Sequence, residues 1–162
     1  MATVNNNLSD YDINSVPNAT QMVFGIVVSE WNEKITKGLL NGAYSTLLKH
    51  GATEANIIVK FLPGAFELPL GAQTMFEKAN VDAVICLGSV IQGETKHFDF
   101  VCEGTALGIK DVALKYNKPT IFGVLTDNTE QQAIDRSGGK HGNKGDEAAI
   151  TAIKMVDFQK NL

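Results

Sequence analysis

The residues best suited to chemistry near neutral pH lie in one loop bracketed by glycines, which ends at His97. Imidazole is the side chain that exchanges protons in this pH range. Thr95 can cap a helix that begins near Lys96, so backbone N–H groups and the positive end of a helix dipole converge there. Such a helix start binds anions. The loop therefore predicts an anion site beside a proton-transfer group, although a lone histidine is often only a packing or surface residue.

Three other residues have types and places that suit a ligand. Trp31 is the only tryptophan and could either pack or stack on a flat heterocycle. Glu67 lies near a predicted helix start, where it could cap the helix or accept hydrogen bonds from a polyhydroxylated molecule. Arg136, the only arginine beside thirteen lysines, could hold a phosphate with its planar fork or form a surface pair at a helix end. Together they predict an acid–base site without a metal or a covalent serine.

Other motifs are absent or misleading. The glycine-rich run 138–145 follows no predicted strand and lacks the Gly-Lys-Ser/Thr of a phosphate loop. No nucleophile elbow, zinc spacing or dinucleotide fingerprint occurs. Cys86 and Cys102 are the only cysteines, and we interpret them as core thiols rather than a disulfide framework. His50, near a helix end that favours a cation, is interpreted as structural, and His141 as solvated.

Strands and helices alternate along the chain. Apolar runs with β-branched residues predict strands at 22–28, 56–62, 83–87 and 120–125, with Gly88 opening the loop after the third. Helices are predicted over 34–49, up to 79, over 97–116, up to 136 and over 146–160. This order predicts a four-stranded parallel sheet with helices on both faces, a three-layer α/β/α sandwich. Ligands bind such sheets outside the carboxyl ends of the strands, where the unusual loops lie.

Composition limits the class of protein. Among the 162 residues, 44% are apolar and 20% charged, as in a globular domain. A net charge of -4 without a basic cluster argues against a nucleic-acid partner. The apolar runs are too short for a membrane span and no secretory pattern opens the chain, so we expect a cytoplasmic protein. Residues 1–20 are predicted to be a flexible arm that could order on a neighbouring copy, and residues 21–162 a single catalytic domain.

Several separate blocks resemble the lumazine synthase family, in register from about Met22 to Lys160. Three of them are Pro63–Pro69, Gly88–Phe98 and Gly142–Gly145. The resemblance implies a flavodoxin-like fold and the penultimate step of riboflavin biosynthesis. In that step a transferase condenses 5-amino-6-ribitylaminouracil with 3,4-dihydroxy-2-butanone 4-phosphate, which gives 6,7-dimethyl-8-ribityllumazine, phosphate and water. No cofactor is implied.

The resemblance also assigns residues to the ribitylaminouracil substrate. The pyrimidine would be stacked against Trp31. The ribityl chain would be held by Ala65, Phe66 and Glu67, and the ring edge by Ser89, Val90 and Ile91. His97 would be the catalytic proton shuttle.

The phosphate and the second half of the site follow from the same resemblance. The residues implied for the phosphate are Glu94, Thr95, Arg136 and Lys144. Phe122 and Arg136 would reach in from the neighbouring subunit, with Lys144 helping there. Glu94 departs from the small residue that is common at its position, and an inward carboxylate would weaken substrate affinity.

The resemblance implies an assembly as well. The family forms pentamers, some of which close into a sixty-subunit shell that could hold a riboflavin synthase. The short link from Ser137 to Gly142 favours the shell here. Two alternatives stay open: an archaeal-type riboflavin synthase that dismutates the lumazine, and a non-catalytic flavin- or lumazine-binding shell protein.

Overall fold

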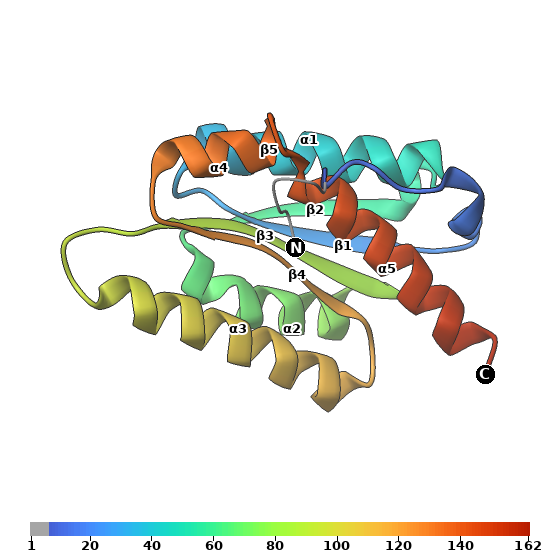
Figure 1. Ribbon diagram of the computed structural model, residues 1–162. Helices are drawn as coiled ribbons and strands as arrows, with labels where there is room; N and C mark the ends of the chain where they lie inside the picture. Colours follow the sequence, from blue (N-terminus) through green and yellow to red (C-terminus); the bar gives the residue numbers. More distant parts are fainter. Residues whose placement is uncertain (1–6) are drawn as a thin grey trace.

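A parallel four-stranded sheet forms the centre of the molecule, in a computed structural model that describes residues 7–162. Its strands run in the order β2-β1-β3-β4, with bounds Ile57–Leu62, Phe24–Ser29, Ala83–Ile91 and Thr120–Asp127. Helices α1 (Glu33–Lys49), α4 (Glu130–Arg136) and α5 (Lys144–Lys160) cover one face, and α2 (Leu68–Lys78) and α3 (His97–Tyr116) cover the other (Figure 1). The predicted three-layer, flavodoxin-like sandwich is confirmed.

Two apolar cores hold these layers together. All of β1 is buried, because helices cover both of its faces and both of its neighbours are strands. On the side of α1 and α5 the core includes Phe24, Leu39 and Ile153, and on the side of α2 and α3 it includes Leu68 and Ile109. The sheet is therefore a rigid base from which the loops at the strand ends project.

Short elements complete the fold. Three 3-10 turns occur at η1 (Ile13–Ser15), η2 (Glu54–Asn56) and η3 (Ala65–Glu67). Between α4 and α5, β5 (Ser137–Gly139) and β6 (Gly142–Asn143) pair as a small antiparallel hairpin. The glycine-rich run predicted as a loop thus folds back on itself. The last helix begins at Lys144, two residues before the predicted start, because the Asn143 side chain caps it by accepting from the Gly145 N–H.

The third strand is longer than predicted. Gly88 was expected to open a loop, but β3 continues to Ile91 because β4 pairs with it as far as Asp127. A Cβ on Gly88 would lie 3.0 Å from Leu68 Cδ1, so the glycine serves close packing against α2 rather than a turn. The sequence signal for a loop was therefore a packing signal.

The N-terminal segment packs on its own chain from residue 7 onward. Leu8 and Ala19 are buried, and the Leu8 N–H donates to the His141 carbonyl at 2.9 Å. The Ser9 hydroxyl donates to Asp146 Oδ2 at 2.5 Å. The first six residues of the predicted arm lie outside the described residues.

Two single-residue predictions need correction. Cys86 is buried as expected, but Cys102 is only half-buried. His141 is half-buried rather than solvated, because the hairpin and the N-terminal segment surround it. His50 follows α1 and is buried, in agreement with its interpretation as structural, and burial lowers the pKa of its imidazole. Over residues 7–162, no helix combines the length and apolar character that crossing a membrane requires.

Candidate active site

A cavity of about 590 Å³ opens at the carboxyl ends of β1, β2 and β3. Nine of the residues singled out in the sequence line it, although they come from segments far apart in the chain. They are Trp31, Ala65, Phe66, Glu67, Ser89, Val90, Ile91, Thr95 and His97. Sequence reasoning assigned no role to Gly64, Gly93, Phe98, Phe100 and Val101, which also line it. Parallel strands bring these loops together, because all of their carboxyl ends lie at one edge of the sheet.

Trp31 lies in the turn that joins β1 to α1. The Trp31 N–H donates to the Pro63 carbonyl at 3.3 Å, and the preceding Glu30 N–H donates to the Leu62 carbonyl at 2.7 Å. These bonds fix the backbone of the turn against the end of β2. The indole itself is 73% exposed, so it is not a core residue and its face is free to stack on a ligand.

Glu67 ends the η3 turn and directly precedes α2. It occupies the N-cap position of α2, as the capping interpretation expects, but its side chain makes no capping hydrogen bond to that helix. Its Oε2 atom lies over Gly64, where an added Cβ would be only 2.9 Å away. The carboxylate is exposed and lines the cavity, an arrangement that suits acceptance of hydrogen bonds from ligand hydroxyls.

His97 is the first residue of α3 and faces the same cavity. The helix begins there, as predicted, and the Thr95 hydroxyl accepts a hydrogen bond from the His97 backbone N–H at 3.3 Å. Thr95 thus satisfies one N–H of the helix start, as predicted. Around Gly93 an added Cβ would meet nothing within 4 Å, so the approach to this helix end is open. The geometry favours an anion beside the imidazole.

Glu94 lies between two residues that line the cavity but does not line it itself. Gly93 and Thr95 do, and Glu94 is exposed. The departure from a small residue therefore does not place a carboxylate in the cavity.

The other predicted residues lie elsewhere. Phe122, Arg136 and Lys144 do not line the cavity of their own chain. Phe122 is on β4, the edge strand, and its ring is 37% exposed. Lys144 begins α5, and its Nζ is 2.6 Å from Glu147 Oε1. We call this second set, Phe122, Arg136 and Lys144, the β4 edge.

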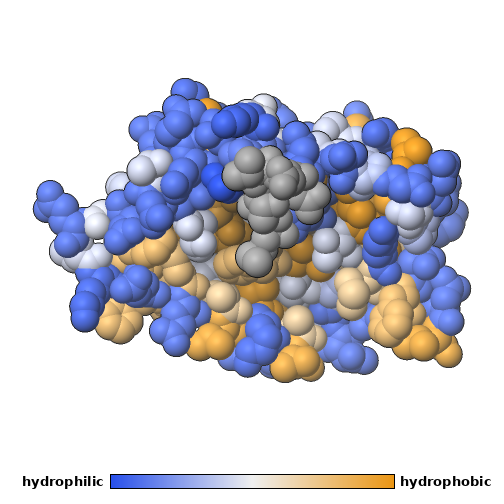
Figure 2. Space-filling model, viewed as in Figure 1, coloured by the Kyte–Doolittle hydropathy of each residue, from blue (hydrophilic) through white to orange (hydrophobic). Residues whose placement is uncertain are grey.

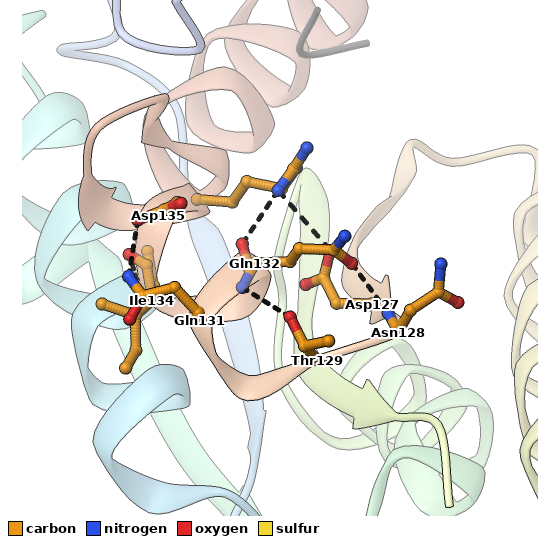
Figure 3. Close-up of polar contacts among 9 residues, drawn as sticks. Asp127, Asn128, Thr129, Gln131, Gln132, Ile134 and Asp135 are labelled. Atoms are coloured by element: carbon orange, nitrogen blue, oxygen red, sulfur yellow. Dashed lines mark hydrogen bonds and ion pairs between the residues drawn. The ribbon is translucent and has the colours of Figure 1, made fainter.

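Arg136 is held at the end of α4 by two interactions. Its Nη1 donates to the Gln132 carbonyl at 3.0 Å and lies 3.9 Å from Asp127 Oδ1. Figure 3 shows Asp127 beside this helix, and also shows its start, where Thr129 accepts from the Gln132 backbone N–H at 3.3 Å. A guanidinium has five N–H donors, so one bond to a carbonyl leaves most of its fork available.

Asp127 is the buried partner in this pair. Burial raises the pKa of its carboxyl group, and the nearby Arg136 guanidinium opposes part of that rise. Its Oδ2 is buried and has no hydrogen-bond partner among the described residues. The pair therefore orients Arg136 without saturating it.

Comparison with known proteins identifies the family. The family described as 6,7-dimethyl-8-ribityllumazine synthase matches residues 21–160. A Cytophaga hutchinsonii protein of that name is 61% identical, over 96% of this chain and 98% of its own length. One from Phocaeicola vulgatus is 59% identical over the whole chain and 96% of its length, and one from Porphyromonas gingivalis is 50% identical over 99% of each. The chain belongs to the 6,7-dimethyl-8-ribityllumazine synthase family.

Proposed function

We propose that this chain condenses 5-amino-6-ribitylaminouracil with 3,4-dihydroxy-2-butanone 4-phosphate, at a site built from the cavity of one copy and the β4 edge of the next. One observation carries the proposal: nine residues from three strand ends converge on one cavity of about 590 Å³. That volume is in the range of small-molecule sites. The match to the family over residues 21–160 supplies the reaction.

The uracil substrate is flat at one end and polyhydroxylated at the other, and the cavity offers a partner for each. Trp31 presents an exposed indole face to the pyrimidine. Phe66 and Glu67, from the η3 turn, hold the ribityl chain, with the carboxylate accepting from its hydroxyls. The end of β3, from Ser89 to Ile91, lies along the ring edge.

The phosphorylated ketone binds at the start of α3. Exposed backbone around Gly93 and Thr95, the helix dipole and the guanidinium of a neighbouring Arg136 together stabilise the phosphate. Lys144 adds a second positive charge from the same neighbour. Phe122 of the neighbouring copy contacts the ribitylaminouracil.

The reaction then needs proton transfer and little else from the protein. The amine of the uracil attacks the ketone and water leaves, which gives an imine. Phosphate leaves by elimination, and the second amine then attacks the remaining carbonyl and closes the ring with loss of a second water. His97 moves protons in these steps, and a positioned acid–base group is typically worth about 10²–10⁴-fold in rate. Holding the two small substrates together supplies much of the rest.

A shared site requires self-association, and the surface supports it. Phe100, Leu107 and Leu114 are exposed and lie seven residues apart along α3. Figure 2 shows apolar side chains gathered over the half of the molecule where α3 and β4 lie. Exposed apolar surface of this kind marks an interaction site. Within the same proposal, the chain forms a pentamer. The short Ser137–Gly142 link favours closure of pentamers into a sixty-subunit shell that could hold a riboflavin synthase. The proposed location is cytoplasmic.

Two assays test the function. Supplying both substrates should produce lumazine, and light scattering on the same sample should give the mass of a pentamer or a multiple of it. Flavin formation from lumazine alone would instead indicate an archaeal-type riboflavin synthase. Binding of ribityl ligands without turnover would indicate a carrier or a containment shell. A monomer that turns over both substrates would contradict the shared site.

A further inference from the structure

Asn32 has a strained backbone next to the cavity. It is one of two non-glycine residues with positive φ among the described residues, with φ 60° and ψ 46°. The other is Asn117, with φ 48°, at the far end of α3. Asparagine tolerates this left-handed conformation better than most residues, yet it still costs energy. The strain at Asn32 calls for a compensating interaction.

The side chain of Asn32 supplies that interaction. It does not cap α1, although it occupies the N-cap position. Instead its Nδ2 donates to the backbone carbonyl of Ser89, on β3, at 2.9 Å. The direction of this bond is unambiguous, because a carbonyl can only accept and the amide nitrogen must face it.

The Ser89 carbonyl lies where the sheet loses a strand. The pairing of β1 with β3 ends at Val28 opposite Leu87, two residues before Ser89. Beyond that point β3 has only β4 on its other side. The Asn32 amide therefore takes the place of a missing strand partner at the floor of the cavity.

The same turn is tied to the opposite neighbour by its backbone. The N–H groups of Glu30 and Trp31 donate to the carbonyls of Leu62 and Pro63, at the end of β2. Residues 30–32 are thus bound on one side to the end of β2 and on the other to the end of β3. Trp31 is held between the two attachments, and of these three side chains only that of Asn32 makes a hydrogen bond to another residue within 7–162.

We propose that Asn32 is a positioning residue for the uracil substrate, because its amide sets the distance between the Trp31 indole and the end of β3 that faces the ring edge. This inference rests on the proposed function. The side chain acts through Trp31 and Ser89 rather than by touching the reacting atoms. Its loss should therefore weaken uracil binding selectively, without disturbing the phosphate side of the site.

Asn32→Gly and Asn117→Gly form a matched pair that tests this. Glycine accepts positive φ without strain, so both variants keep the backbone and remove only the side chain. Asn117 follows the C-terminal end of α3, a 20-residue helix roughly 30 Å long whose other end lines the cavity. Its side chain makes no hydrogen bond to another described residue. Asn32→Asp is the second variant, because a carboxylate can keep the left-handed backbone but cannot donate to the Ser89 carbonyl.

We expect Asn32→Gly to raise the KM for the ribitylaminouracil by about 3- to 10-fold, the size of one hydrogen bond. The KM for the butanone phosphate and the melting temperature should stay at wild-type values. Asn32→Asp should raise the uracil KM further, and Asn117→Gly should leave it unchanged. An unchanged uracil KM in Asn32→Gly, or an equal rise in Asn117→Gly, would overturn the assignment.

A second readout needs no turnover. Because Trp31 is the only tryptophan, selectively excited tryptophan fluorescence reports on this turn alone. Acrylamide quenching should increase in Asn32→Gly and Asn32→Asp, and should match wild type in Asn117→Gly. Equal quenching in all four proteins would refute the positioning role. If the wild-type protein forms no lumazine, the proposed function fails, while the quenching series still decides whether Asn32 holds Trp31.

Discussion

The cavity and the β4 edge differ in whether their titratable side chains already form ion pairs. In the cavity, His97 and Glu67 are exposed and take part in no ion pair with another described residue. At the β4 edge, both cations already have acidic partners, Asp127 for Arg136 and Glu147 for Lys144. The cavity is therefore hollow and its titratable side chains are unpaired within the described residues, whereas the cations of the β4 edge are already oriented by acidic partners.

Under the proposed function, this difference explains why one chain supplies only half of a site. A hollow surface and an oriented charged surface on one subunit are complementary when copies associate head to tail. Orientation of Arg136 and Lys144 in advance reduces the entropy lost when a phosphate binds. Variants that affect either the cavity or the β4 edge, and leave the other region unchanged, test this comparison.

The largest effect is expected in the cavity, from His97→Ala. Turnover should fall by about 10²- to 10³-fold, because proton transfer is lost while orientation of the substrates survives. The KM values should change little. Steady-state kinetics with both substrates measures this, and His141→Ala is the control, since His141 lies in the hairpin outside the cavity. Equal losses in the two variants would contradict a special role for His97.

Removal of the guanidinium from the β4 edge should come next. Arg136→Ala should raise the KM for the butanone phosphate by roughly 10- to 100-fold, which is about 1.5–3 kcal/mol for hydrogen bonds to a charged group. The affinity for the ribitylaminouracil should not move. Arg136→Lys should give an intermediate value, because it keeps the charge but loses the fork. A phosphate KM equal to that of wild type would count against the role.

A smaller effect is expected at the aromatic wall of the cavity. Trp31→Ala should raise the KM for the uracil about 3- to 10-fold, since aromatic stacking is worth about 0.5–1.5 kcal/mol beyond the area buried. Trp31→Phe keeps a stacking face and should stay close to wild type. A change confined to the butanone phosphate would place the indole in the wrong half of the site.

The smallest effect concerns stability rather than turnover. Burial raises the pKa of folded Asp127, so just above the ordinary Asp range the folded chain keeps a proton that the unfolded chain releases. Stability from this group therefore falls as the pH rises through that window. Asp127→Asn cannot ionise and should gain up to about 1 kcal/mol at neutral pH, with the gain shrinking in acid. Loss of stability at neutral pH would mean that the Arg136 pair outweighs burial.

Much of the fold and most of the residues that line the cavity could be predicted from the sequence, for physical reasons. Apolar runs and their alternation with helices define a doubly covered parallel sheet, which brings the loops after Ser29, Leu62 and Ile91 to one edge. The family blocks then assign the residues on those loops. Gly88 misled the prediction, because a glycine needed for close packing against Leu68 has the same sequence signal as one needed for a turn.

The remaining features depend on contacts that no local pattern records. The bond from Asn32 to the Ser89 carbonyl joins residues 57 positions apart, and only the sheet register explains it. Asp127 lies just beyond the strand predicted over 120–125, yet in the fold it is the buried partner of Arg136. Pairing across elements of this kind is a tertiary property, so composition and periodicity cannot reveal it.

A site shared between subunits requires that His97 of one copy and Arg136 of another serve the same reaction. Mixing dissociated His97→Ala and Arg136→Ala subunits in equal amounts and reassembling them tests it directly, with each variant reassembled alone as the control. In a head-to-tail ring, roughly a quarter of the sites regain both side chains, so we predict activity near that fraction of wild type. Activity no higher than the average of the two variants alone would contradict a site shared between subunits.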